Sequence, residues 1–188
     1  SPSAALGFGF AACAAVQLAV ELPATLARVR SAPAATGPTY RRRAAALFTH
    51  AGVVVIAVGM LASGLFRQTA SVAMAPGDEV VLGGHRLHLD GVESVTGPNY
   101  HAQQARFVLD GGPVVLSPQR RLYHSGMPTT EAGIHGTAWR DVYVVFGEAR
   151  DGRYPVTAYV NPLVRWIWAG AVLMVIGALA ARGRARRA

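Results

Sequence analysis

The chain has 188 residues, of which 52% are hydrophobic, and its formal net charge is +8. All eighteen basic residues are arginine. An excess of positive charge is compatible with a nucleic-acid-binding protein or with a membrane protein, and the positions of the arginines distinguish the two. The single cysteine, Cys13, excludes a disulfide within the chain. Any folded domain must therefore be held together by its own apolar core.

Three apolar stretches predict transmembrane helices, at residues 1–22, 44–66 and 162–181. A run of ~20 helical residues rises ~30 Å, which is the thickness of the hydrocarbon layer of a membrane. No basic residue precedes the first stretch, so it does not read as a secretory signal peptide. The first residue is Ser1, and we expect the native chain to continue upstream of it.

The arginines outside the spans are divided unequally. Residues 23–43 carry five arginines and residues 182–188 carry four, and neither segment contains an acid. Residues 67–161 carry eight arginines against nine aspartates and glutamates. The positive-inside rule therefore predicts a cytoplasmic loop at 23–43, a cytoplasmic tail at 182–188 and an extracytoplasmic segment at 67–161 of a bacterial inner-membrane protein. This division excludes nucleic-acid binding.

The extracytoplasmic segment is rich in strand-forming residues. Its β-rich runs are punctuated by Gly-Gly, Gly-Pro and Asp-Gly pairs and cover residues 79–82, 86–95, 105–109, 114–116 and 141–146. About seven short strands are expected in it, which predicts a small barrel or sandwich. Residues 129–131 follow a proline and predict a turn. The fold class is an integral membrane α-helical protein with three transmembrane helices and an inserted small all-β extracytoplasmic domain.

His50 is the first candidate functional residue, because it lies inside the second predicted span. Arg43 marks the cytoplasmic end of that span, which puts His50 roughly 10 Å further along the helix. Ionisable side chains in a membrane are costly, and they usually face a protein interior. A neutral imidazole is a common axial ligand of haem iron. A polar contact to a neighbouring helix is the other interpretation, and the residue alone leaves both open.

The start of the third span contains the second candidate, Arg165. Asn161 is predicted to cap this helix and Pro162 to occupy its first position. Trp166 and Trp168 fit the aromatic belt at the outer membrane interface. Arg165 is expected either to extend to the lipid headgroups or to pair with an anionic group such as a haem propionate.

Five further histidines lie in the β-rich segment, at positions 85, 88, 101, 124 and 135. His85 and His88 are three residues apart, which on a strand directs their side chains to opposite faces and disfavours a metal site. Glu148 flanks an apolar strand and is predicted to be a charge at the rim of the domain. The sequence contains no Ser-His-Asp order, phosphate-binding loop or Cys-x-x-Cys motif that predicts a catalytic residue.

Several segments together resemble a known family. They are residues 41–60 (RRRAAALFTHAGVVVIAVGM), 97–100 (GPNY), 128–131 (PTTE), 140–143 (RDVY) and 160–168 (VNPLVRWIW). In this order they are similar to the C-terminal portion of the CcmF family of cytochrome c maturation proteins. The resemblance covers nearly the whole chain. It is most specific at residues 160–168 and least specific in the first span.

The resemblance implies a haem lyase subunit, which takes part in joining haem vinyl groups to the thiols of apocytochrome c at the outer face of the membrane. It also implies a b-type haem held in the membrane by two histidines, one of which falls on His50. The implied partners are a haem chaperone, thiol-handling maturation subunits, apocytochrome c, the N-terminal remainder of the protein and membrane lipid. The family's Trp-rich segment and second axial histidine have no counterpart here, so the chain alone is not expected to be an active enzyme.

A second class of function remains compatible with the sequence. In this alternative the chain is a non-catalytic, membrane-anchored periplasmic β-domain of an assembly or secretion complex, and His50 is a packing contact between helices. A transporter fragment is less favoured, because the spans show no paired charges and no broken helix.

Overall fold

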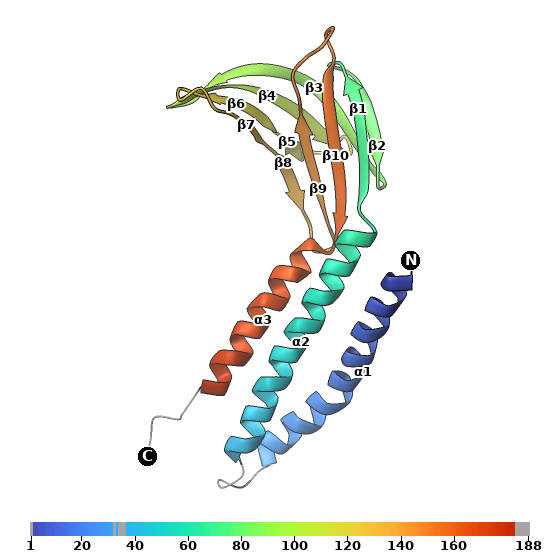
Figure 1. The fold of residues 1–188 in the computed structure, drawn as a ribbon, viewed down its shortest axis with the longest axis vertical. Coiled ribbons are helices and arrows are strands. Elements are labelled where there is room, and N and C mark those ends of the chain that lie inside the picture. The colour runs from blue at the N-terminus through green and yellow to red at the C-terminus, as the bar shows by residue number, and fades with distance from the viewer. Residues whose placement is uncertain (1, 32, 34–36, 183–188) are drawn as a thin grey trace. The chain divides into compact units, whose positions relative to one another are not determined.

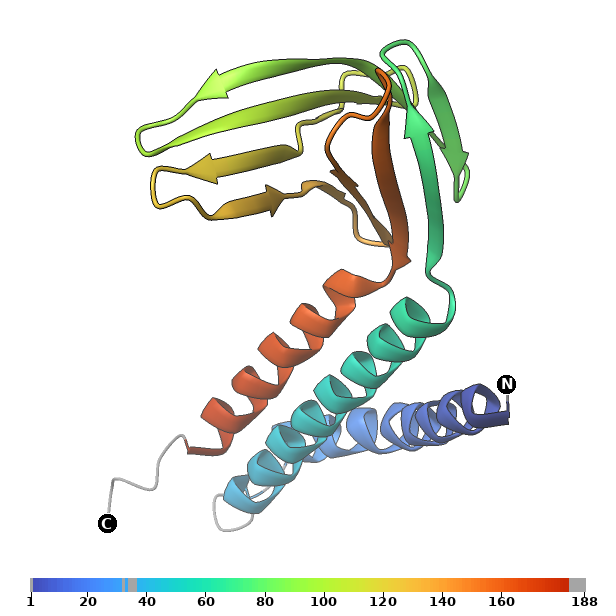
Figure 2. The ribbon, with the colours of Figure 1, turned by 45° about the horizontal axis from the view of Figure 1, so that its top comes forward.

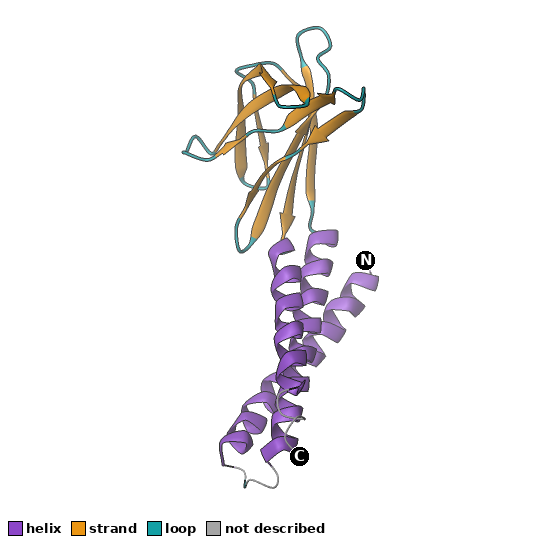
Figure 3. Cartoon of the chain, turned by 90° about the vertical axis from the view of Figure 1, so that its left-hand side faces the viewer, coloured by secondary structure: helices purple, strands orange, loops and turns teal. Residues whose placement is uncertain are grey.

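The computed structural model describes residues 2–31, 33 and 37–182, and the chain divides into two compact units. The first unit consists of Ser1–Leu65 and Leu163–Ala188 and contains the helices, whereas the second, Phe66–Pro162, contains the strands (Figures 1 and 3). The predicted fold class is confirmed: three helices able to span a membrane and an inserted all-β domain. The predicted cytoplasmic tail, with its arginines at 184, 186 and 187, lies outside the described residues except for Arg182.

The helical unit contains α1 (Pro2–Ser31), α2 (Gly37–Leu65) and α3 (Val164–Arg182). Each is long and apolar enough to cross a membrane. Helix α1 continues past Leu22 and α2 begins well before Ala44, so the prediction that residues 23–43 form a loop is wrong for most of that segment. The predicted boundaries lie where the apolar composition ends, which marks the part of a helix that lies in the membrane. The helices themselves continue beyond it, through alanine, leucine and arginine residues that favour helix.

Glycine residues bring the backbones of α2 and α3 into direct contact. A Cβ atom placed on Gly170 would lie 2.6 Å from the carbonyl oxygen of Gly52, and one placed on Gly177 would lie 2.8 Å from that of Ala45. Only glycine fits at such positions, because the neighbouring backbone atoms cannot move aside. Small residues that allow close approach are a general means of joining helices in membranes. Helix α3 is therefore held against one side of α2 along several turns.

Helix α1 packs on a different side of α2. A Cβ atom on Gly7 would meet a methyl group of Leu61 at 2.8 Å. The Arg43 guanidinium of α2 donates a hydrogen bond of 2.9 Å to the carboxylate of Glu21, and Thr25 of α1 is 2% exposed. Two sides of α2 are thus occupied by helices of this chain, and the rotation of α2 is defined by both contacts.

The strand unit is a sandwich of two antiparallel sheets (Figure 2). The smaller sheet has the order β1 (Gln68–Met74), β10 (Tyr154–Pro162), β9 (Arg140–Phe146) and β8 (Gly133–Gly136). The larger sheet has the order β2 (Glu79–Leu82), β3 (His85–Thr96), β4 (Tyr100–Leu109), β6 (Gln119–Tyr123) and β7 (Pro128–Glu131), with β5 (Val115–Leu116) paired to β4.

The core lies between the two sheets and needs no covalent link. Leu87, Leu89 and Phe107 of the larger sheet and Val144 and Val156 of the smaller sheet are at most 1% exposed. They belong to one contiguous cluster of buried apolar side chains. Alternation along each strand places these residues inward and their neighbours outward. Burial of apolar surface on this scale is the main favourable term in the folding of the domain.

Two predictions about the strands need correction. Residues 129–131 form part of β7 rather than a turn, because residues 128–131 pair in register with residues 119–122 of β6. The segment also contains ten strands instead of about seven, the additional ones being short or proline-containing and therefore weak in sequence signal.

The predicted start of the third helix is also wrong. Strand β10 continues through Asn161 and Pro162, and the side-chain oxygen of Asn161 accepts a hydrogen bond of 2.9 Å from Nε of Arg67 instead of capping a helix. The strand ends at Pro162, the backbone changes direction at Leu163, whose φ angle is 56°, and α3 begins at Val164. Sheet pairing with Asp141 outweighed the local capping preference.

The glycine contact generates the first prediction. Replacing Gly170 with alanine is expected to lower the free energy of unfolding by about 1–3 kcal/mol, because the methyl group must displace backbone atoms of α2. The loss is measured as a lower midpoint of thermal unfolding of the detergent-solubilised protein by circular dichroism. Gly64→Ala is the matched control, because nothing lies within 4 Å of a Cβ atom at that position. Equal midpoints for the two variants would contradict the contact.

Candidate functional site

His50 lies on the side of α2 that neither α1 nor α3 covers. Thr49 and Gly52 face α3, and Ala51 faces α1. With ~3.6 residues per helical turn, His50 shares the third side of α2 with Val53 and Met60. Val53 and Met60 are 47% and 59% exposed, and His50 is exposed as well. We call this side, residues 46, 50, 53, 57 and 60, the open face of α2.

The imidazole of His50 is fixed by the backbone one turn earlier. Its Nδ1 atom lies 2.8 Å from the carbonyl oxygen of Ala46. A carbonyl oxygen only accepts hydrogen bonds, so Nδ1 carries the proton and Nε2 of the neutral ring keeps its lone pair. A histidine that ligates a metal commonly has its other ring nitrogen bound to a backbone carbonyl in this way. The geometry therefore fits a haem iron ligand.

Arg165 is in the first turn of α3, and the structure does not bring it to His50. Gly59 of α2 lies beside Leu163 and Ile167, whereas Thr49 lies beside Gly177. His50 is therefore separated from the level of Arg165 by about 14 Å along the helix axis. Arg165 is exposed, and the helical period places it on the side of α3 opposite the residues that face α2.

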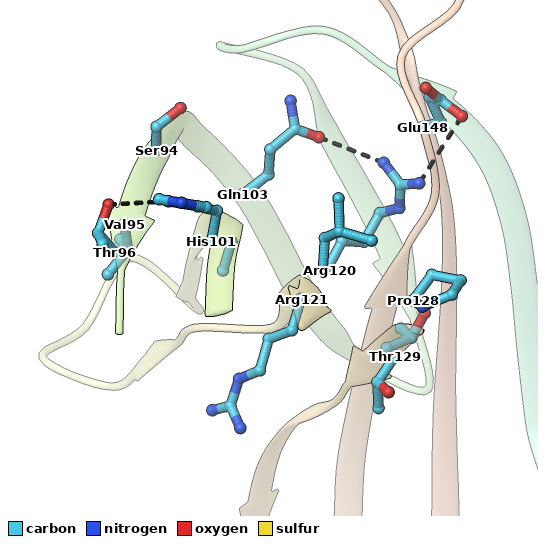
Figure 4. A pocket seen from close by; sticks show the side chains of 13 residues that line it. Ser94, Val95, Thr96, His101, Gln103, Arg120, Arg121, Pro128, Thr129 and Glu148 are labelled. Carbon is cyan, nitrogen blue, oxygen red and sulfur yellow. Dashed lines mark hydrogen bonds and ion pairs between the residues drawn. The ribbon is translucent and has the colours of Figure 1, made fainter. Parts of the chain in front are cut away.

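The strand unit contains a hollow of about 650 Å³ on the larger sheet, lined by both polar and apolar residues (Figure 4). Its lining includes His101, Gln103, Arg120 and Thr130, with Glu148 at one side. In Figure 4 the guanidinium of Arg120 extends toward Gln103 and Glu148, at 3.3 and 3.7 Å, whereas Arg121 extends away from them. The sequence gives no sign of this hollow, because its residues come from strands that only the fold brings together.

A second hollow, of about 570 Å³, contains both His85 and His88. The expectation that they face opposite ways fails because His85 is the first residue of β3, where its ring turns to the next hairpin and donates to Asp110 at 2.8 Å. His88 lies 3.3 Å from Asp90. Within the part of the chain that the structure describes, no three His, Cys, Asp or Glu side chains are arranged to hold a metal ion.

Asp110 is a carboxylate of this second hollow with two hydrogen-bond donors. It accepts a hydrogen bond of 2.7 Å from the backbone N–H of Arg86 in addition to the one from His85. These bonds, the backbone one first, hold the pKa of Asp110 below its ordinary value. Its φ angle of 54° closes the turn before Gly111, a conformation that aspartate and asparagine tolerate better than most residues.

Comparison with known proteins gives the family. Residues 65–162, which comprise the entire strand unit, match the model of the CcmF C-terminal beta-sandwich. The chain belongs to the CcmF family. The resemblance found in the sequence is therefore confirmed.

The relatives extend the similarity beyond the β domain. The chain is 41% identical over 138 residues to the cytochrome c-type biogenesis protein ccl1 of Rhodobacter capsulatus, covering 69% of this chain and 21% of that protein. It is 41% identical over 145 residues to the cytochrome c-type biogenesis protein CcmF of Pseudomonas aeruginosa, covering 73% of this chain and 22% of that one. The matched part of the chain thus spans about a fifth of the length of these curated relatives.

A solved structure shares the fold. The chain is similar, with a TM-score of 0.79 and 20% sequence identity, to a protein named cytochrome c heme lyase CcmF. The similarity covers 97% of this chain and 31% of that one. At this identity the likeness establishes the arrangement of helices and strands.

The lowered pKa of Asp110 generates the second prediction. Its carboxylate stabilises the folded protein above the ordinary pKa of aspartate, and this contribution is lost as the pH falls through the lower pKa of the folded state. Asp110→Asn is therefore expected to reduce the acid-induced fall of the urea unfolding midpoint between about pH 5 and pH 2. Asp151→Asn is the control, because Asp151 has a similar φ of 51° before a glycine. An equally steep acid response in Asp110→Asn and the wild type would contradict the assignment.

Proposed function

We propose that this chain is the C-terminal part of a cytochrome c haem lyase subunit, and that His50 is one of two axial ligands of a b-type haem inside the membrane. The subunit takes part in attaching haem covalently to the thiols of apocytochrome c at the outer face of the bacterial inner membrane. Membership of the CcmF family and the names of the relatives, which are cytochrome c-type biogenesis proteins, support this role. The geometry of His50 carries the proposal for this chain's own contribution.

The tautomer of His50 is the first support. Because Nδ1 donates to the Ala46 carbonyl, Nε2 is the nitrogen available to iron without any loss of a proton. The same hydrogen bond restricts rotation of the ring, so less conformational freedom is lost when Nε2 binds. A packing histidine would instead be expected to make its contact with a neighbouring helix, and the contact here is to its own helix.

The open face of α2 is the second support. It contains no acid, and apart from His50 its residues are apolar or small; Val53 and Met60, which follow His50 along the helix, are exposed. Such a surface suits the face of a porphyrin or the apolar side of another helix. The 138 and 145 aligned residues are only 21% and 22% of the two curated relatives. These proteins are therefore several times longer than this chain, and their remainder is available to supply the opposite wall and the second histidine.

A bound haem supplies a one-electron couple whose potential depends on its axial ligands. In this proposal the residues of the chain hold that group: His50 provides one ligand, the Ala46 carbonyl orients it, and the apolar open face excludes water. Arg165 contacts either lipid headgroups or an anionic partner at the opposite end of the helices. No catalytic residue of the ligation reaction is assigned to this chain.

The distribution of arginine supports the proposed orientation. Arg28, Arg30 and residues 41–43 belong to the connected ends of α1 and α2, whereas the strand unit begins just after the other end of α2. The positive-inside rule then places the arginine-rich ends in the cytoplasm and the β domain in the periplasm. A haem chaperone, thiol-handling maturation subunits and apocytochrome c are the proposed partners there.

The third prediction tests the ligand. In the full-length protein, His50→Ala is expected to abolish the low-spin b-type visible spectrum, because removal of an axial imidazole leaves a five-coordinate or dissociated haem. The spectra of the oxidised and reduced proteins are recorded at equal protein concentration, with haem content measured separately.

Met60→Ala is the control for this experiment. It alters the same open face two to three turns away and removes no nitrogen ligand, so the low-spin spectrum should persist. A low-spin spectrum that is the same in His50→Ala as in the wild type would eliminate His50 as the ligand.

A further inference from the structure

The larger sheet is longer than the core that it covers. Along β4, alternate residues Ala105, Phe107 and Leu109 face the core and are at most 4% exposed. The next residues on this same inner face, Gln103 and His101, are exposed. Since side chains of one strand face are two residues apart, the inner face continues past the core but is no longer covered by the smaller sheet.

The residues of the inner face change from apolar to mostly polar where the smaller sheet no longer covers it. Gln103 pairs with Ser94 on one side and with Arg120 on the other, and His101 pairs with Thr96 and Leu122. Apart from Leu122 and its partner Pro128, the apolar side chains of the core are replaced on this face by hydrogen-bonding ones. Together they line the hollow of about 650 Å³ in Figure 4, which we call the inner-face hollow. Its residue types suit a polar ligand.

The electrostatics of the inner-face hollow favour an anion. Arg120 is the cation that extends into it, and its nearest carboxylate is Glu148, at 3.7 Å and with a side chain that is 80% exposed. An exposed ion pair of this length contributes little, so an incoming carboxylate can replace Glu148 at low cost. The guanidinium offers two parallel N–H donors to such a group.

The adjacent edge of the sheet is open for backbone pairing. The β6–β7 hairpin begins with a hydrogen bond from Tyr123 N–H to the Met127 carbonyl. Alternation along an antiparallel ladder then makes Arg121 and Thr129 a hydrogen-bonded pair, and Arg120 and Thr130 a non-bonded pair. The N–H and C=O of Thr130 therefore point outward, and among the described strands the sheet ends at β7.

We propose that the inner-face hollow and the edge of β7 bind an extended polypeptide that carries an acidic side chain. The peptide backbone pairs with Thr130, and its carboxylate pairs with Arg120. Addition of a strand to a sheet edge with a side-chain pocket beside it is a recurring mode of peptide recognition. The hollow supplies the specificity for charge, and the edge supplies sequence-independent affinity.

This inference deepens the proposed function, on which it rests only for the identity of the peptide. A haem lyase has to hold an unfolded polypeptide on the side of the membrane where the β domain lies, and an extended segment of that polypeptide is the occupant to which the proposal commits. Neither His50 nor haem enters the binding argument, so the two proposals can fail separately.

The fourth prediction is made for the full-length protein in detergent. The probe is a short fluorescein-labelled peptide in which threonine and glutamate alternate, and its binding is followed by fluorescence anisotropy. Arg120→Gln is expected to weaken binding by at least about tenfold, because a charge-assisted hydrogen bond is lost. Arg106→Gln is the matched control: its exposed side chain pairs with Asp90 on the other face of β4, and it should bind like the wild type.

Two further arms test the charge and the edge. A peptide of alternating threonine and lysine should bind at least about tenfold more weakly than the acidic probe. Thr130→Pro should weaken binding by removing the outward N–H, whereas Thr130→Val keeps that N–H and should not. Equal binding by Arg120→Gln and Arg106→Gln, or no binding of the acidic probe to the wild type, would overturn the proposal.

The haem spectrum of the same preparations separates this result from the previous proposal. Arg120→Gln is expected to keep the visible spectrum of the wild type while losing the peptide. A variant that loses both would show a damaged protein and contradict a local role for Arg120. Loss of the haem spectrum in His50→Ala with normal peptide binding would show that the peptide site does not depend on the haem site.

Discussion

The contact between the backbones of α2 and α3 is the constraint on which the helical unit depends. Gly52, Gly170 and Gly177 have no room for a side chain, so the two helices meet in one rotational setting. That setting, together with the packing of α1 against Leu61, decides which side of α2 remains open. His50 is on that side because of its spacing from the glycines, and a shift by one residue would turn it toward α3, as Thr49 is, or toward α1, as Ala51 is. The proposed ligand is thus positioned by packing elsewhere on the helix.

A comparable constraint shapes the β domain. One apolar core joins the two sheets, but the larger sheet extends beyond it, and the exposed part of its inner face is polar. Replacing apolar residues by His101, Gln103 and Arg120 at this place avoids a large exposed apolar patch. It also leaves a hollow with a cation and an adjacent open edge. The feature that avoids an exposed apolar patch is therefore also the basis of the proposed binding of a polar chain.

The sequence was sufficient for the features that depend on local composition. The three apolar stretches predicted the span-capable helices, and the β-rich run at residues 86–95 predicted a strand, in which the structure buries Leu87 and Leu89. The resemblance at residues 160–168 and elsewhere gave the family. His50 was identified because an imidazole in an apolar helix is chemically conspicuous, although only the structure shows that it lies on the open face with Nδ1 on the Ala46 carbonyl.

Features that depend on long-range pairing were not predictable. Residues 129–131 look like a turn, and only their pairing with β6 makes them a strand. Asn161 looks like a helix cap, but it is drawn into β10 by its neighbours in the sheet. The inner-face hollow depends in addition on the irregularity between Leu89 and Gly91, which changes the residues of β3 that face inward. A bulge of this kind reverses the alternation that a reading of the sequence relies on.

Chemical rescue of the missing imidazole tests the central claim most directly. Full-length protein with His50→Gly has space where the ring was, and free imidazole added to it can reach the iron from the same side. The account predicts that the low-spin haem spectrum is lost in this variant and returns as imidazole is added. A variant whose low-spin spectrum equals that of the wild type before any imidazole is present would contradict it.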